Sequence, residues 1–397
     1  MSAAVTSPMR AWCHVGQAAA ALAGGMGVGR FAYTPILPAM HAQAGLSTVA
    51  GAQLATANYV GYLAGALAGI AFPAVSRSRA TLRGSFAVLI ASLAAMPATE
   101  SEFVWMVLRG LAGVTSALIF VFAVSALLSG LRESHAHLAG WGFGGVGAGI
   151  AASGLLVLVL LPITDWRAAW WASAALTAVL AAIGWTLRTA PGDPTPAVGA
   201  KLRPVWPGAP GRFAALLISY TLEGAGYIVA GTFLVAAIEQ KATGGLGSSA
   251  WVLAGAAAVP ASALWMRLGR RWSRLHLLLA ALVLQGVGIA LPALTDGVGA
   301  DLASAALFGG TFVGISALAL AVGNELRFPR SVGLLTAGYS VGQIVGPLVV
   351  APILQQGYGP ALLTAGAIVL AAAVTAAGVG RVPARQFSTP AVPLSEK

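Results

Sequence analysis

Long apolar stretches alternate with short polar gaps along the whole chain. Each stretch is close to the roughly 20 residues that a helix needs to cross the hydrocarbon core of a bilayer. Charged residues make up only 8% of the sequence, so most gaps are short and few stretches are interrupted. The pattern predicts an all-α membrane protein with twelve transmembrane helices. We place them near residues 12–40, 47–72, 84–99, 103–130, 137–161, 166–187, 212–238, 248–266, 275–295, 301–324, 331–355 and 360–380.

The longest polar gap divides the predicted spans into six and six. It covers residues 188–211 and is rich in proline and glycine, which predicts a flexible linker rather than a helix. Residues 1–187 are therefore a predicted N-terminal six-helix bundle. Residues 212–397 are a predicted C-terminal six-helix bundle with a short tail.

The two predicted bundles resemble each other weakly in sequence. Residues 24–34 (GGMGVGRFAYT) in span 1 match residues 222–232 (LEGAGYIVAGT) in span 7. Residues 144–154 in span 5 match residues 337–347 in span 11. Pseudo-symmetric six-helix halves are typical of transporters in which the halves rock around a solute site near the middle of the membrane.

Basic residues occupy alternate gaps. Of the 22 Lys and Arg residues, only Arg167 and Lys241 lie in gaps on the other side, and two more lie inside spans. Lys and Arg are retained on the cytoplasmic side during insertion, which predicts a multi-pass protein of a bacterial cytoplasmic (inner) membrane with both termini cytoplasmic. The net charge of +11 then faces anionic lipid headgroups rather than nucleic acid.

Four segments together resemble the YbfB/YjiJ-like branch of the major facilitator superfamily: residues 25–40, 58–67, 222–233 and 337–347. The resemblance extends over essentially the whole chain. It implies a major-facilitator-like fold and secondary transport. The chain departs from the superfamily pattern after span 2, where the gap keeps its arginines but has no acid, and at Arg109, where span 4 lacks the usual Gln.

Three ionisable residues lie deep in apolar spans: Arg30, Arg109 and Glu223. A charge at the centre of a membrane helix costs about 2.5 to 3.5 kcal/mol on insertion scales, so each of them is expected to have a partner or a function. Glu223 is the only deep acid. Burial favours the neutral form of a carboxyl group, so a modest change of surroundings would load or release a proton, and we expect Glu223 to carry the coupling proton. The alternative is a permanent hydrogen bond to a neighbouring helix.

The two arginines have different expected roles. Arg30 is expected to hold an anionic solute or to pair with Glu223 when the cavity is empty. The alternative is a fixed ion pair that holds spans 1 and 7 together; the sequence favours neither, and both roles are compatible with different states. Arg109 is predicted to be shallow enough for its side chain to reach the headgroups, which favours a structural role. The superfamily resemblance implies a proton-relay role for Arg109 instead.

Polar and aromatic residues share helix faces with these charges, because a four-residue spacing aligns side chains on one side of a helix. Such groups supply the hydrogen bonds and ring surfaces of a small-molecule pocket, although in a helix bundle they also link helices. The candidates for solute or proton binding are Tyr33, Asn58 with Tyr62, Glu223 with Tyr227, and Gln343. Trp141 and Tyr339 are weaker candidates.

An intramembrane enzyme would need a nucleophile, base or metal constellation at membrane depth. The five histidines lie at span ends or in gaps, and Cys13 is the only cysteine. We therefore expect no catalytic residue, no metal site and no cofactor other than a coupling proton. We expect a monomer whose partners are a small-molecule solute and the lipid bilayer.

The predicted function is secondary active transport of a small organic solute by alternating access, coupled to protons. Two alternatives stay open at this level: an exporter of drug-like or sugar-like compounds, and a membrane receptor that does not transport.

Overall fold

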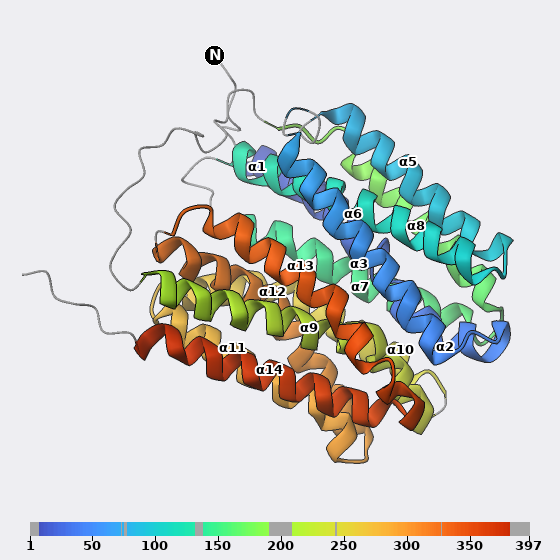
Figure 1. The fold of residues 1–397 in the computed structure, drawn as a ribbon. Coiled ribbons are helices and arrows are strands. Elements are labelled where there is room, and N and C mark those ends of the chain that lie inside the picture. The colour runs from blue at the N-terminus through green and yellow to red at the C-terminus, as the bar shows by residue number, and fades with distance from the viewer. Residues whose placement is uncertain are drawn as a thin grey trace, which may run out of the picture.

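The computed structural model describes residues 8–72, 74, 78–131, 138–189, 209–242, 244–326 and 328–381. The described part is a bundle of long helices that run side by side (Figure 1), which confirms the all-α prediction. Eleven helices are long and apolar enough to cross a membrane. They are α3 (Thr48–Ala71), α5 (Arg79–Ala95, continued by the short helix η2, Met96–Ala98), α6 (Glu102–Gly130), α7 (Ala139–Leu160), α8 (Trp166–Gly184), α9 (Ala209–Lys241), α10 (Leu246–Leu268), α11 (Arg274–Leu294), α12 (Val298–Glu325), α13 (Ser331–Val350) and α14 (Tyr358–Arg381).

The first predicted span is broken into three pieces. Helix α1 (Pro8–Leu22) leads into the π-helical turn η1 (Ala23–Val28), and helix α2 (Tyr33–Ala44) follows after four residues without regular helix. The Gly29 amide donates to the Gly24 carbonyl, five residues earlier, at 2.9 Å. Such π-turns are rare and often occur at functional sites. The predicted counterpart in the second half, α9, is unbroken over 33 residues.

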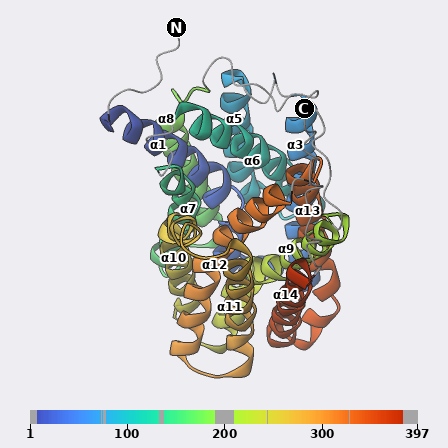
Figure 2. The ribbon, with the colours of Figure 1, turned by 90° about the vertical axis from the view of Figure 1, so that its left-hand side faces the viewer.

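Helices before and after the predicted linker form two groups (Figures 1 and 2). In the first group α3 packs on α6, α5 on α6 and α8, and α1 with η1 on α7; in the second, α9 packs on α13 and α14, and α12 on α10 and α11. The groups meet where α7 packs along α10, α3 along α13 and α2 along α9. The predicted linker at residues 188–211 lies largely outside the described residues.

One end of the bundle, the basic end, carries the starts of α5 and α11 and the end of α10. Its described arginines are Arg79, Arg83, Arg267, Arg270, Arg271 and Arg274. At the opposite end, the Tyr358 hydroxyl and the His41 Nε2 atom lie 3.1 Å apart in a hydrogen bond that joins the two groups.

Glycine lets α7 approach its neighbours at backbone distance. A Cβ atom added to Gly255 of α10 would lie 2.2 Å from the Ala151 amide nitrogen of α7. On another face of α7, a Cβ atom at Gly149 would lie 2.4 Å from the Ala23 carbonyl oxygen of η1. Helices in lipid pack closely where small residues line the contact. These glycines therefore let α7 pack closely on η1 and also on α10 of the second group.

We expect Gly255→Ala to lower the thermal unfolding temperature of the purified protein in detergent. The new methyl group would meet the α7 backbone, and such overpacking typically costs about 1–3 kcal/mol. The matched control is Gly310→Ala in α12, where an added Cβ atom meets nothing within 4 Å. Equal unfolding temperatures for the two variants would contradict the close α7–α10 contact.

Candidate functional site

Arg109 lies inside the first group and is 1% exposed, so the prediction that it reaches the headgroups was wrong. Its Nη2 atom donates to the Arg30 carbonyl at 3.1 Å, and its Nη1 atom donates to the Gly29 carbonyl at 3.5 Å. The guanidinium also lies over the rings of Tyr33 at 4.8 Å and Trp170 at 5.9 Å. These contacts hold a buried cation against fixed dipoles and ring faces.

The Arg30 carbonyl is available because the first span is irregular at this point. In a continuous α-helix the Thr34 amide would donate to it, but that amide instead donates to the Phe31 carbonyl at 3.2 Å. Phe31 has lost its own helical donor because Pro35 has no N–H. Arg109 therefore satisfies a backbone group that the break leaves free, as an intramembrane helix break requires.

Tyr33 and Asn58 belong to the same structural cluster. The Tyr33 hydroxyl donates to the Gly51 carbonyl at 2.9 Å, and its ring stacks on Trp170. The Asn58 Nδ2 atom donates to the Arg109 carbonyl at 2.9 Å and ties α3 to α6. Both side chains are buried, and their contacts support the helix-linking alternative for this pair.

Arg30 lies instead between the two groups. Its Nη2 atom donates to Gln343 Oε1 of α13 at 2.7 Å, and Gln343 Nε2 donates to the Tyr227 hydroxyl of α9 at 3.0 Å. The guanidinium lies 4.3 Å from the ring centroid of Tyr62 and 4.9 Å from that of Tyr59. The structure thus brings four predicted residues together: Arg30, Tyr62, Tyr227 and Gln343.

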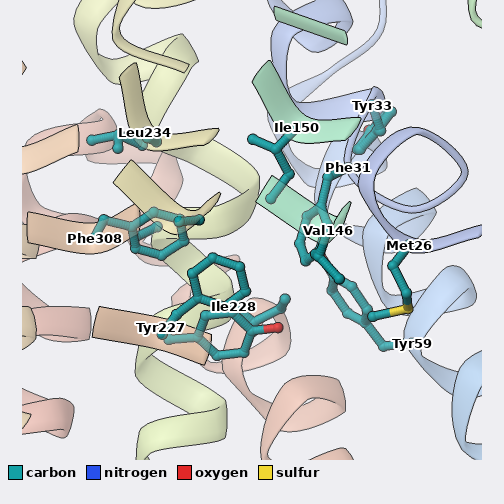
Figure 3. Close-up of a cluster of buried hydrophobic side chains, with 14 of the residues drawn as sticks. Met26, Phe31, Tyr33, Tyr59, Val146, Ile150, Tyr227, Ile228, Leu234 and Phe308 are labelled. Atoms are coloured by element: carbon teal, nitrogen blue, oxygen red, sulfur yellow. The ribbon is translucent and has the colours of Figure 1, made fainter. Parts of the chain in front are cut away.

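Aromatic rings extend this cluster across the interface. Phe31 lies 6.3 Å from both Trp251 and Phe312, measured between ring centroids. Tyr227 stacks on Phe312 at 6.0 Å and on Tyr339 at 5.5 Å. In Figure 3, Phe31 and Tyr59 from the first group lie across from Tyr227 and Phe308 of the second.

Glu223 lies near the middle of α9 and is fully buried. The side chain of Gln285, from α11, lies close to this carboxyl group. Neither carboxyl oxygen of Glu223 and neither polar atom of Gln285 has a partner within hydrogen-bonding geometry among the described residues. No ion pair of the described residues includes Glu223 or Arg30, so the predicted alternative of a fixed pair between them was wrong.

Sequence reasoning missed Tyr59 and Gln285. The Tyr59 hydroxyl shares a hydrogen bond of 2.8 Å with Thr232 of α9, and its ring faces Arg30. A signal existed, because Tyr59 precedes Tyr62 by three residues, which also places two side chains on one helix face. Gln285 carried a signal as a lone amide in the middle of an apolar span.

Trp141 does not belong to the site. It is 45% exposed and lines a cavity of about 730 Å³ at the basic end, together with Arg267, Arg270 and Arg271. Among the described residues, no three His, Cys, Asp or Glu side chains are grouped so that they could hold a metal ion.

Comparison with known proteins shows the family of the chain. A family model described as "Uncharacterised MFS-type transporter YbfB" matches residues 22–377. The chain belongs to this family. The match confirms the predicted membership of the YbfB-like branch, and the chain is a multi-pass membrane transporter of the major facilitator superfamily.

Solved structures agree on the fold. A crystal structure of a mutant of the nucleoside transporter NupG is 12% identical, with a TM-score of 0.69, covering 92% of this chain and 99% of that one. A second NupG crystal structure, also 12% identical, has a TM-score of 0.67 and covers 94% and 99%. At this identity the likeness concerns the fold alone. No curated protein sequence matches the chain.

We expect Arg109→Ala to destabilise the protein strongly, because it removes the donors of two buried carbonyls. Each buried polar group left unpaired costs about 1–3 kcal/mol. Thermal unfolding in detergent measures the effect. The control is Arg167→Ala, which removes an exposed arginine that pairs with Glu100 and lies over the Trp166 ring. An exposed ion pair is worth about 0–1 kcal/mol, so a larger loss at Arg167 than at Arg109 would contradict this role.

Proposed function

We propose that the protein is a proton-coupled secondary transporter of a small organic solute, built from twelve spans in two six-helix halves that rock between two faces of the membrane. In this proposal α1, η1 and α2 together form the first span. The observation that carries the proposal is Glu223, a fully buried acid in the middle of α9 without a cation or hydrogen-bond partner among the described residues.

The environment of Glu223 favours its neutral form. An unpaired carboxylate in an apolar interior is costly, so the acid holds a proton when its surroundings are dry. Rocking of the halves would change the contacts between the two groups, including those of α9 with α2, and the entry of water or a cation would release the proton. One reversible proton per cycle is the minimum that coupling requires.

The solute is expected at the contact between the halves. Arg30 comes from the first span, Tyr62 from α3, Tyr227 from α9 and Gln343 from α13. Relative movement of the halves must therefore change the distances among these groups. A site that is rebuilt by each movement is what alternating access needs.

We expect Glu223→Gln to abolish concentration of solute by a pH gradient while leaving the amount of folded protein unchanged. A thermal-shift screen against a metabolite library would first identify a stabilising solute, since a ligand stabilises the folded state by mass action. Reconstituted wild type should then accumulate that solute in liposomes with a pH gradient, and Glu223→Gln should only equilibrate it.

The matched control is Glu239→Gln, on the same helix. Glu239 Oε1 accepts from the Gly247 amide at 2.9 Å, and glutamine keeps that acceptor. Undiminished pH-driven accumulation by Glu223→Gln would refute the coupling role. Binding without accumulation by the wild type would favour a receptor that does not transport.

We also expect the basic end to face the cytoplasm. The chain has one cysteine, so Cys13→Ser gives a cysteine-free background. Ile163→Cys, 77% exposed at the opposite end, should react with a membrane-impermeant maleimide in intact cells. Ser273→Cys, exposed before α11 at the basic end, should react only after permeabilisation. The reverse pattern would overturn the orientation.

A further inference from the structure

Arg30 is a buried cation without a matching acid. It is 3% exposed, and its Nε atom has no hydrogen-bond partner within the described part of the chain. The ion pairs of the described residues all lie elsewhere, at exposed or half-exposed positions: Arg167 with Glu100 and Asp165, Lys241 with Asp296, and Arg274 with Glu325. An arginine cannot lose its proton in a protein, so its charge stays unbalanced within the described chain.

Arg109 shows what a structural arginine looks like in this bundle. Both of its terminal nitrogens donate to backbone carbonyls of its own group of helices. Arg30 has one hydrogen-bond partner, Gln343, and this side chain belongs to the other group. The contact of Arg30 is therefore one that relative movement of the groups would break.

The Gln343 side chain occupies the place beside Arg30 that an anionic ligand would take. Its Nε2 atom donates to the Tyr227 hydroxyl, which fixes the amide so that Oε1 faces the Arg30 guanidinium. An amide oxygen is a neutral acceptor, whereas a carboxylate offers two charged oxygens to the fork of N–H groups on arginine. A carboxylate would thus displace Gln343 Oε1 with a gain in interaction.

The faces of aromatic rings surround the Arg30 guanidinium. Its guanidinium lies over the rings of Tyr62, Tyr59 and Phe31, the last at 5.4 Å from the centroid. Across the interface the rings of Tyr227 and Phe312 are nearly parallel, at an interplanar angle of 6°. Ring faces of this kind pack well on a planar solute.

Access is expected from the basic end. Tyr62 is only partly buried, and it follows Asn58 by one turn in the direction of that end. Tyr339 is also partly buried, and it precedes Gln343 by one turn on the same side. Toward the opposite end the cluster is covered, because Tyr59 bonds Thr232 and the Thr34 hydroxyl donates to the Gly231 carbonyl at 2.5 Å.

We propose that the solute is a flat organic monocarboxylate, aromatic or similarly planar. Its carboxylate pairs with Arg30 in place of Gln343, and its ring lies among Tyr59, Tyr62 and Tyr227. One permanent cation balances one negative charge, so a monoanion fits and a dianion leaves a buried charge unpaired. The proposal rests on the proposed transport function and names its substrate class.

The test is binding at fixed pH, which does not depend on transport. Purified protein would be titrated with benzoate, phenylacetate and indole-3-acetate, and with the carboxamide of each. We expect at least one carboxylate to raise the unfolding temperature and to bind at least tenfold more tightly than its carboxamide. Failure of all three carboxylates at millimolar concentration, or equal binding of acid and amide, would overturn the proposal.

Arg30→Lys keeps the charge but loses the planar fork, so we expect carboxylate affinity to fall more than tenfold. Arg167→Lys is the matched control, since Arg167 also lies over a ring, at 4.9 Å from Trp166, but outside the site. Unchanged affinity in Arg30→Lys would refute the assignment.

Gln343→Glu covers the case in which Arg30→Lys fails to fold. It would place a carboxylate on Arg30, so it should raise the unfolding temperature and abolish carboxylate binding together. Retained binding would refute the site. The two proposals fail separately: carboxylate binding without pH-driven accumulation removes only proton coupling, and pH-driven accumulation of neutral solutes alone removes only the substrate class.

Discussion

The hydrogen bond from Arg109 to the Arg30 carbonyl supports the irregular backbone between η1 and α2, within the first predicted span. A bilayer offers no water to a free carbonyl, so a break in a spanning segment needs a donor from the protein. The guanidinium supplies that donor, and the rings of Tyr33 and Trp170 help to keep it in place. The position of Arg30 at the interface depends on this support.

The buried polar residues then sort into three sets with different tasks. Arg109, Tyr33 and Asn58 hold the first group of helices together. Arg30 and Gln343 join the two groups across their contact, with Tyr227 as the next hydrogen-bonding partner. Glu223 has no hydrogen bond to either set among the described residues, and Gln285 lies close to its carboxyl group. Only the set of Arg30, Gln343 and Tyr227 spans the two groups, so only that set depends directly on how the groups sit relative to each other.

The sequence was sufficient for most of the fold. Apolar length predicted the all-helical architecture, and the observed α6, α12 and α14 begin and end within three residues of the predicted spans. Pattern could not show that the first span contains a π-turn, because glycines and a proline in an apolar run are equally compatible with a continuous helix. That turn is a product of packing: a Cβ atom at Gly27 would lie 2.5 Å from the Gly149 Cα atom.

The site, like the fold, could be predicted from the sequence only in part. The positions of charges within the apolar stretches singled out Arg30, Arg109 and Glu223, since a charge at membrane depth is rare enough to be informative. It could not assign partners, because these come from helices that are distant in sequence: Gln343 lies 313 residues after Arg30. Span boundaries could not show that the Arg109 side chain points into its own group of helices, because the position of a residue along a helix says nothing about which way its side chain points.

The unbroken length of α9 has a mechanical consequence. Glu223 lies within one unbroken helix of 33 residues, so we expect it to change position only when that helix moves as a unit. Arg30 lies in the irregular turn between η1 and α2, where changes in a few backbone torsions would redirect its side chain. The position of Glu223 therefore depends on the placement of its whole helix, whereas the position of Arg30 depends on the local backbone.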